Sequence, residues 1–128
     1  LPEGTKNMAW KPISEADLWD KINLAETKMS VAQRRFWNAI RILPEKWAQH
    51  PYGDEGGGFW VVAIIGRVTI WFNDIEGGFN RSTYRRYGLI EEYFSNQDEL
   101  ELSVQHVLTA TEIGDDVGGK CGPPQPIS

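Results

Sequence analysis

The stretch FWVVAIIGRVTIWFN, residues 59–73, holds two runs of β-branched and aromatic residues on either side of Gly66–Arg67. Such runs are typical of β-strands, and glycine at the first position of a two-residue loop suits a type II′ hairpin turn. Residues 59–65 are apolar throughout, which predicts a strand that is covered on both faces. Residues 68–73 instead alternate between two faces. One of these faces carries Val68, Ile70 and Phe72, and the other carries Thr69 and Trp71.

A third antiparallel strand is expected after this hairpin. The sequence NDIEGG at 73–78 has the composition of a turn, and the residues that follow it alternate. The two faces of the third strand would be formed by Phe79, Arg81 and Thr83 and by Asn80, Ser82 and Tyr84. The sequence LIEEYF at 89–94 fits either a fourth short strand or a helical turn. We therefore expect a three-stranded antiparallel meander, to which residues 89–94 could add a fourth strand.

Two consecutive helices are expected before the hairpin. Residues 12–29 place apolar side chains at helical spacing after Ser14, and residues 30–42 do so after Ser30. Each serine is a suitable N-cap, and Pro44 helps to end the second helix. Because the connection between the two is tight, an antiparallel helical hairpin is the simplest packing.

A final helix is expected at residues 95–112, with Ser95 and Asp98 at the spacing of a capping box. Residues 44–58 instead predict a loop, because Pro51 and three consecutive glycines exclude regular structure. The order helix, helix, strand, strand, strand, helix predicts an α+β fold, in which the helices pack on the antiparallel meander.

The chain has 128 residues, which is the size of a single domain. We expect a flexible segment at 1–12, one α+β domain at 13–113, and a disordered tail rich in glycine and proline at 114–128. The first residues, 1–7, would be an addition ahead of a native start at Met8.

The composition restricts the partners of the protein. Its net charge of −5 disfavours nucleic acid and anionic membrane surfaces, because phosphate contacts need clustered Lys and Arg. The sequence has no apolar run long enough to span a membrane and no N-terminal signal segment. The one cysteine, Cys121, cannot form an intrachain disulfide, which suits a reducing compartment. We therefore expect a cytoplasmic protein that needs no cofactor and binds neither nucleic acid nor membrane.

Two short stretches, DEGGGFW at 54–60 and DIEGGFN at 74–80, each place two acids before glycines and an aromatic residue. The first stretch leads into the hairpin and the second leaves it, so both should lie at the same end of the sheet. We call the four acids of these two turns the acidic rim. They are Asp54, Glu55, Asp74 and Glu76.

Carboxylates grouped in this way have four interpretations. They can ligate a hard cation such as Ca²⁺ or Mg²⁺, although their spacing matches no EF-hand, and the sequence leaves a metal site undecided. They can act as acid and base in hydrolysis, with His50 assisting. They can form an acidic face that attracts a basic protein. They can also be the polar part of two glycine turns, partly neutralised by Arg81, Arg85 and Arg86.

The sequences WFNDIEGGFNRSTYRRYG at 71–88 and NQDELE at 96–101 resemble an uncharacterised family of small bacterial cytosolic proteins, over residues 35–110. In size, acidity and tryptophan content the chain is also similar to bacterial toxin-immunity proteins. Those proteins are acidic α+β domains that bind and neutralise a toxin. This resemblance implies a non-enzymatic function and carries over no catalytic residue.

A protein-binding module with a basic partner is the function that these features favour, because aromatic residues in an acidic surface make a suitable binding hot spot. The expected binding residues are Tyr52, Asp54, Glu55, Trp60, Asp74, Glu76, Phe79 and Arg81. The alternatives are a small hydrolase or metal-binding protein that uses the acidic rim, and a homodimer formed through the sheet edge or the Trp-rich helices.

Overall fold

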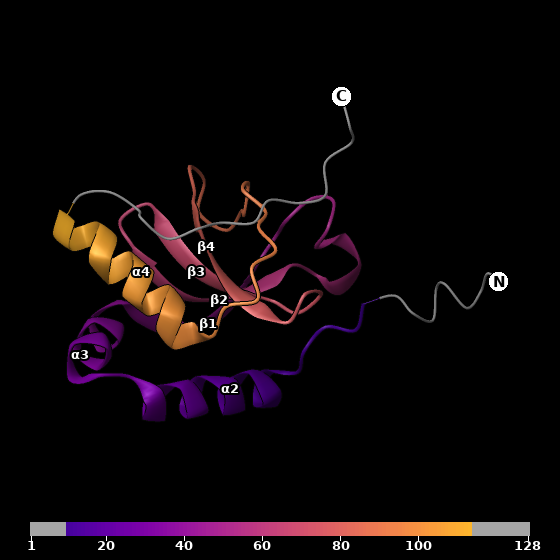
Figure 1. Cartoon of the computed structure of the whole chain (residues 1–128). Coiled ribbons are helices and arrows are strands. Elements are labelled where there is room, and N and C mark those ends of the chain that lie inside the picture. The colour runs from indigo at the N-terminus through magenta and orange to yellow at the C-terminus, as the bar shows by residue number, and fades with distance from the viewer. Residues whose placement is uncertain (1–9, 114–128) are drawn as a thin grey trace.

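The computed structural model describes residues 10–113, which form an α+β fold with helices packed on an antiparallel sheet (Figure 1). The strands follow one another in the order β1-β2-β3-β4, so the sheet is a four-stranded meander. In chain order the elements are α2 (Glu15–Lys28), α3 (Val31–Ile40), β1 (Arg41–Trp47), the short 3-10 helix η1 (Asp54–Gly56), β2 (Phe59–Ile65), β3 (Val68–Asn73), β4 (Gly78–Thr83) and α4 (Leu100–Ile113). Across residues 10–113, every helix is too short or too polar to span a bilayer.

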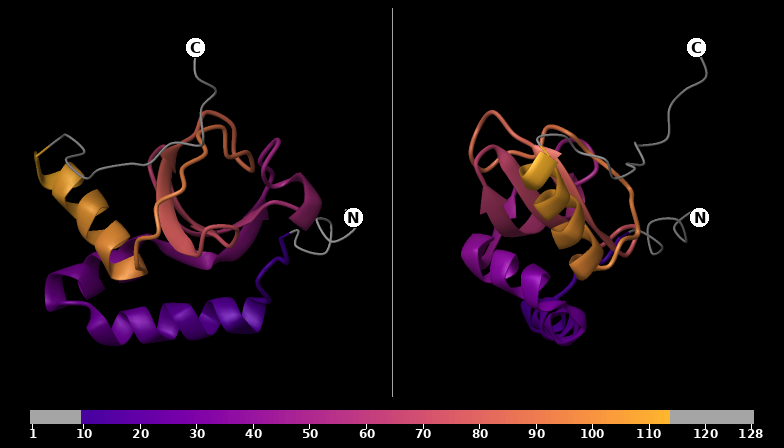
Figure 2. Two further views of the ribbon diagram at one scale, coloured as in Figure 1. Left: turned by 45° about the vertical axis from the view of Figure 1, so that its right-hand side comes forward. Right: turned by 60° about the vertical axis from the view of Figure 1, so that its left-hand side comes forward.

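The sheet separates two hydrophobic clusters. Figure 2 shows the helices on one side of the curved sheet and the long segment after β4 on the other. The helix-side cluster includes Leu18, Ile22, Val62, Ala63, Ile70, Phe72, Phe79, Leu100 and Val104. The loop-side cluster is built on Trp47, Phe59, Val61, Trp71, Ile90 and Tyr93. Long connecting segments therefore take the place that a second layer of helices or strands would otherwise fill.

Strand β2 supplies side chains to both clusters, as its apolar sequence predicts. Its register with β3 shifts between Val61, which pairs with Trp71, and Ala63, which pairs with Ile70. The extra residue, Val62, forms a β-bulge. The bulge places Val62 and Ala63 together in the helix-side cluster, whereas strict alternation would have put them on opposite faces.

The predicted hairpin and its third strand are confirmed. Gly66 has φ 58°, and no non-glycine residue between 10 and 113 has a positive φ, which fits a type II′ turn. Strand β3 keeps the predicted alternation, with Ile70 in the helix-side cluster and Trp71 in the loop-side cluster. Strand β4 does the same, since Phe79 faces the helices and Tyr84, just after the strand, packs with the loop-side cluster.

The loop predicted at 44–58 is wrong at its start, because Arg41–Trp47 form the edge strand β1 and pair with β2. Proline has no N–H to donate to a neighbouring strand, so in sheets it is found only in edge strands and at irregular positions. Pro44 lies on such an edge, between Arg41 and Glu45, where the register with β2 shifts. The second helix accordingly ends at Ile40, and the fourth strand is β1.

The first two helices do not form the predicted antiparallel hairpin. The backbone of Met29 and Ser30 between them is extended, with ψ of 142° and 169°, and each helix packs against α4 (Figures 1 and 2). Glu26 fixes this corner, because its carboxylate accepts the Trp37 indole N–H at 2.8 Å and pairs with Arg41. The predicted N-caps are both present and are Ser14 and Ser30.

The last helix begins at Leu100 and not at residue 95. The side chain of Asn80 accepts the Asn96 N–H at 2.8 Å and donates to the Asn96 carbonyl at 3.0 Å. Asp98 then bridges to β4. Because these bonds hold 96–98 extended along β4, the helix starts after them. Residues 89–94 are irregular and form neither a strand nor a helical turn, apart from a single bridge at Leu89.

Ser82 links the core of the sheet to the segment that covers it. Its hydroxyl accepts the Trp71 indole N–H at 2.9 Å and donates to the Glu92 carbonyl at 2.7 Å. In S82A the buried indole loses its acceptor, and an unsatisfied buried donor costs about 1–3 kcal/mol. We expect the free energy of unfolding in urea, followed by tryptophan fluorescence, to fall by this amount. T83A at the exposed neighbour should cost less than about 1 kcal/mol, and equal losses would contradict the assignment.

Candidate functional site

The two acidic turns meet at one end of the sheet, around Trp10. The ring of Trp10 stacks on Phe59 with centroids 5.3 Å apart. It also fills the space beside Gly56, where an added Cβ would lie 2.1 Å from the indole. Asp74 lies beside the same indole, and its carboxylate accepts the Ile13 N–H at 2.7 Å. The predicted convergence of the two turns is therefore confirmed, through an aromatic residue that the sequence analysis did not single out.

Trp10 belongs to the segment 1–12 that was expected to be flexible. Its contacts with both turns show that residues 10–12 lead into the packed domain. The remainder of that segment, residues 1–9, lies outside the described residues, as does the tail at 114–128 with Cys121.

The four rim carboxylates differ in their surroundings. Asp54, Glu55 and Glu76 are exposed, and the Asp54 side chain retains 53% of its accessible surface. Asp74 is half-buried. Lys46 lies between the turns and donates to the carbonyls of Gly56 and Gly58 at 3.0 and 3.4 Å. Over the part of the chain that is described, no three His, Cys, Asp or Glu side chains are placed to hold a metal ion.

Asp74 has the most perturbed environment of the rim. Burial raises the pKa of its carboxyl above the usual value. The N–H of Ile13, the charge of Lys46 and the Trp10 indole act in the opposite direction without cancelling the effect of burial. Asp74 therefore joins the N-terminal segment to the sheet through Oδ2, while its Oδ1 atom is buried without a hydrogen-bond partner.

The glycines of the two echoed stretches have matching structural roles. Gly57 and Gly77 have positive φ, 78° and 83°, and face open space. Gly58 and Gly78 follow them and lie against other backbone segments. A Cβ on Gly58 would meet the Trp47 carbonyl oxygen at 2.1 Å, and one on Gly78 would meet the Gln97 Cα at 2.2 Å. The next residue in each stretch is a buried phenylalanine. Phe59 is the first residue of β2, and Phe79 is the second residue of β4.

Two of the expected binding residues lie in the interior. Phe79 is 4% exposed and packs in the helix-side cluster, and Arg81 is 2% exposed with its guanidinium 3.9 Å from Asp98. Neither side chain is available at the surface of the rim. Tyr52 and Trp60 are half-buried: Tyr52 stacks on Tyr93, and the Trp60 indole donates to the Ile13 carbonyl at 3.3 Å.

His50 lies beside the rim, as its sequence position suggests. Its Nδ1 is 2.6 Å from the Asp54 carboxylate, and 83% of its side chain is exposed. The pair sits on the open surface of the loop. Such exposure gives a base no enclosed site in which to hold a substrate.

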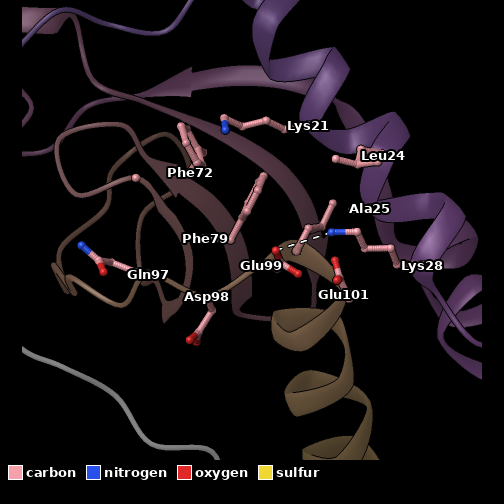
Figure 3. Close-up of a pocket in the computed structure, with 12 residues that line it drawn as sticks. Lys21, Leu24, Ala25, Lys28, Phe72, Phe79, Gln97, Asp98, Glu99 and Glu101 are labelled. Carbon is pink, nitrogen blue, oxygen red and sulfur yellow. Dashed lines mark ion pairs between the residues drawn. The ribbon is translucent and has the colours of Figure 1, made fainter.

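A cavity of about 230 Å³ opens beside the β3–β4 turn, between α2 and the start of α4 (Figure 3). We call it the α2–α4 pocket. Gly77 belongs to its wall, but none of the four rim carboxylates does. Its walls are formed by Lys21, Leu24, Ala25, Lys28, Phe72, Gly77, Phe79, Gln97, Asp98, Glu99, Leu100 and Glu101.

Charged groups from two helices face this pocket. Lys28 of α2 pairs with Glu99 at 3.6 Å, and the Lys21 ammonium lies 5.5 Å from the centre of the Phe72 ring. Burial raises the pKa of Glu101, and the adjacent Glu99 carboxylate raises it further. The sequence analysis interpreted Asp98 as a helix cap and did not single out Glu101. The sequence did carry one signal for this pocket. Lys21 and Lys28 are seven residues apart, and this spacing puts both on one face of α2.

Comparison of the chain with protein-family models, with curated proteins and with solved structures finds no match. The candidate sites of this protein are therefore judged on their geometry.

The raised pKa of Asp74 makes stability depend on pH. Between the usual value of 3.8 and the raised value, the folded protein binds more protons at this carboxyl than the unfolded chain does. Its contribution to the free energy of unfolding therefore falls as pH rises through this window. D74N keeps an oxygen for the Ile13 N–H but has no such titration. We expect the stability of wild type relative to D74N, from urea unfolding at a series of pH values, to decrease with rising pH and then level off. A difference that is constant or increases would contradict the burial of Asp74.

Gly57 and Gly58 provide a matched pair for the loop. G57A places a side chain at positive φ in open space and should cost about 1–2 kcal/mol. G58A adds a clash with the Trp47 carbonyl to the same conformational strain. We expect its loss of stability in urea unfolding to be roughly twice that of G57A or more. Equal losses would show that the loop can move away from β1.

Proposed function

We propose that the protein is a non-enzymatic binding module whose acidic rim contacts a basic surface on a protein partner. The observation that carries this proposal is the pair of turns, each with exposed carboxylates, that pack around the same residue, Trp10. Fixed carboxylates at one end of an acidic protein raise the rate of encounter with a basic partner.

The turn between β3 and β4 supports the proposal because its backbone is held in place. The Asn73 side chain accepts the N–H groups of Ile75 and Glu76 at 3.0 and 3.2 Å and donates to the Phe94 carbonyl at 3.0 Å. Ile75, between the two acids of this turn, is 39% exposed and offers an apolar contact. A surface that is already ordered loses little conformational entropy on binding.

Hydrolysis is less well supported. Of the four rim acids, three are exposed, Asp74 is engaged by Ile13, and none lines the neighbouring pocket. A homodimer through the free edge of β1 is also less well supported, because Pro44 offers no N–H there. The similarity in size, acidity and tryptophan content to toxin-immunity proteins leads us to include a basic toxin among the partners proposed.

The proposal is tested by the double variant D54A/E76A. Partners are captured on the immobilised full chain at low salt, identified, purified, and measured for association and dissociation rates. Loss of two exposed charges should leave the fold intact and lower the association rate constant at least about tenfold at low salt. The difference should shrink at high salt, because ions screen the attraction.

The matched control is D20A/E112A, which removes the same charge from exposed positions on α2 and α4. Its association rate should remain close to that of the wild type. Binding that is unchanged in D54A/E76A, or reduced equally in both double variants, would overturn the assignment of the acidic rim as the contact surface.

A further inference from the structure

The helix-side cluster is open at the end of the sheet that carries the β2–β3 turn. A cavity of about 280 Å³ lies there, between the second half of α4 and the strands beside this turn. We call it the hairpin pocket. Its apolar wall is formed by Ile65, Val68, Val107 and Ala110. Ile65 and Val68 are only half-buried, although both pack against the helix-side cluster. Within residues 10–113 the core is therefore incompletely covered at this end.

Three polar side chains in the wall of the hairpin pocket are already engaged. Arg81 is 2% exposed, and its guanidinium lies 3.9 Å from the Asp98 carboxylate. The Ser82 hydroxyl makes its two hydrogen bonds within the loop-side layer. The Thr111 hydroxyl donates to a carbonyl of its own helix at 2.9 Å. The pocket therefore suits an occupant that covers apolar surface and brings no charge into it.

The chain itself supplies such an occupant just beyond α4. Thr111 belongs to the wall of the pocket, and α4 ends two residues later at Ile113. The sequence continues GDDVGGKCGPPQPIS at 114–128, and Val117 is its first branched apolar residue. Four extended residues span up to about 14 Å, whereas Thr111 and Ile113 are about 3 Å apart along the helix axis. Val117 is therefore within reach of the pocket.

The sequence between α4 and Val117 suits a chain that turns back toward the pocket. Gly114 follows the last helical residue, and glycine is preferred where a chain leaves a helix and reverses its direction. Asp115 and Asp116 favour solvent, whereas the side chain of Val117 favours an apolar surface. The cavity has the volume of roughly nine water molecules, which matches one branched residue with its peptide group.

We propose that the chain after α4 turns back at Gly114 and docks the Val117 side chain in the hairpin pocket. The docked side chain covers Ile65, Val68 and Ala110, and so closes the helix-side cluster at this end. Residues 114–117 thereby become part of the folded domain. The hairpin pocket and the acidic rim lie at opposite ends of β2 and β3, so this inference does not depend on the proposed function.

The test uses the full chain and its single cysteine, Cys121, four residues after Val117. A nitroxide attached to Cys121 weakens the NMR signals of backbone amides that lie near it. The same label is attached to the wild type and to V117D, in which only a residue beyond α4 is changed. We expect the amides of Val68, Thr83 and Ala110 to lose most of their signal in the wild type. In V117D they should recover about half of it or more, because burying an unpaired carboxylate is costly.

Two further variants assign the contact to residues. A110E places a charge on the wall of the pocket and should restore the amide signals of Val68 and Thr83 as V117D does. I127D makes the matched change at the other branched apolar residue of 114–128 and should keep the wild-type pattern. Thermal unfolding establishes that A110E is folded. If it is not, V117D remains decisive, because it changes no residue of α4 or of the sheet.

A mixed sample distinguishes docking within one chain from exchange between two copies. Isotope-labelled C121S protein, which carries no nitroxide, is combined with nitroxide-labelled protein that has no isotope label. We expect the signals of Val68, Thr83 and Ala110 to keep their intensity in this mixture.

Selective signal loss in the wild type, reversed by V117D and A110E and retained in I127D, would support the proposal. Three outcomes would overturn it. The first is the same pattern in wild type and V117D, the second is release by I127D instead of V117D, and the third is a loss in the mixed sample equal to that within one chain. The rim variant D54A/E76A should keep the wild-type pattern, so the hairpin pocket and the proposed protein-binding surface can succeed or fail separately.

Discussion

The structure depends on a strand, β2, whose side chains are all aliphatic or aromatic and which must therefore be covered on both faces. Helices α2, α3 and α4 cover one face. Within residues 10–113 the other face is covered by two long connecting segments, the loop before β2 and the chain after β4. Irregular backbone over a hydrophobic cluster needs partners for its polar groups, because an unsatisfied buried N–H or carbonyl is costly. Much of the polar chemistry inside this protein serves that need.

Buried polar side chains meet this requirement at defined points. Asn80 satisfies both backbone groups of Asn96, Ser82 accepts from Trp71 and donates to the chain after β4, and Gln49 accepts the N–H groups of Tyr52 and Gly53. The glycines allow the same segments to approach other backbone closely. The loop-side layer is thus held by specific hydrogen bonds, although long connecting segments form most of it within residues 10–113.

The same arrangement creates two different surfaces around the β3–β4 turn. Toward the loop before β2, the turn joins Asp74 to Trp10 and presents exposed carboxylates to solvent. Toward α2 and α4, Gly77 forms part of a small pocket with mixed charge and an aromatic wall. The first surface is open and acidic, and the second is a small enclosed space beside the Lys28–Glu99 pair. The two could act independently, because none of the four rim carboxylates lines the pocket.

The sequence by itself determined the α+β class, the central hairpin, the serine caps and the meeting of the two acidic turns, because these follow from local periodicity, turn chemistry and strand direction. Tertiary structure decided the rest. Pro44 is tolerated in β1 because β1 is an edge strand, and the bulge at Val62 changes which side chains of β2 face each cluster. Hydrogen bonds between Asn80 and Asn96 keep the chain extended there, so α4 begins later than predicted. The pocket was equally hidden, since its walls come from α2, the β3–β4 turn and the start of α4, and Lys28 and Glu99, which pair there, are 71 residues apart in the chain. Contacts over such separations leave no periodic signal in a single sequence.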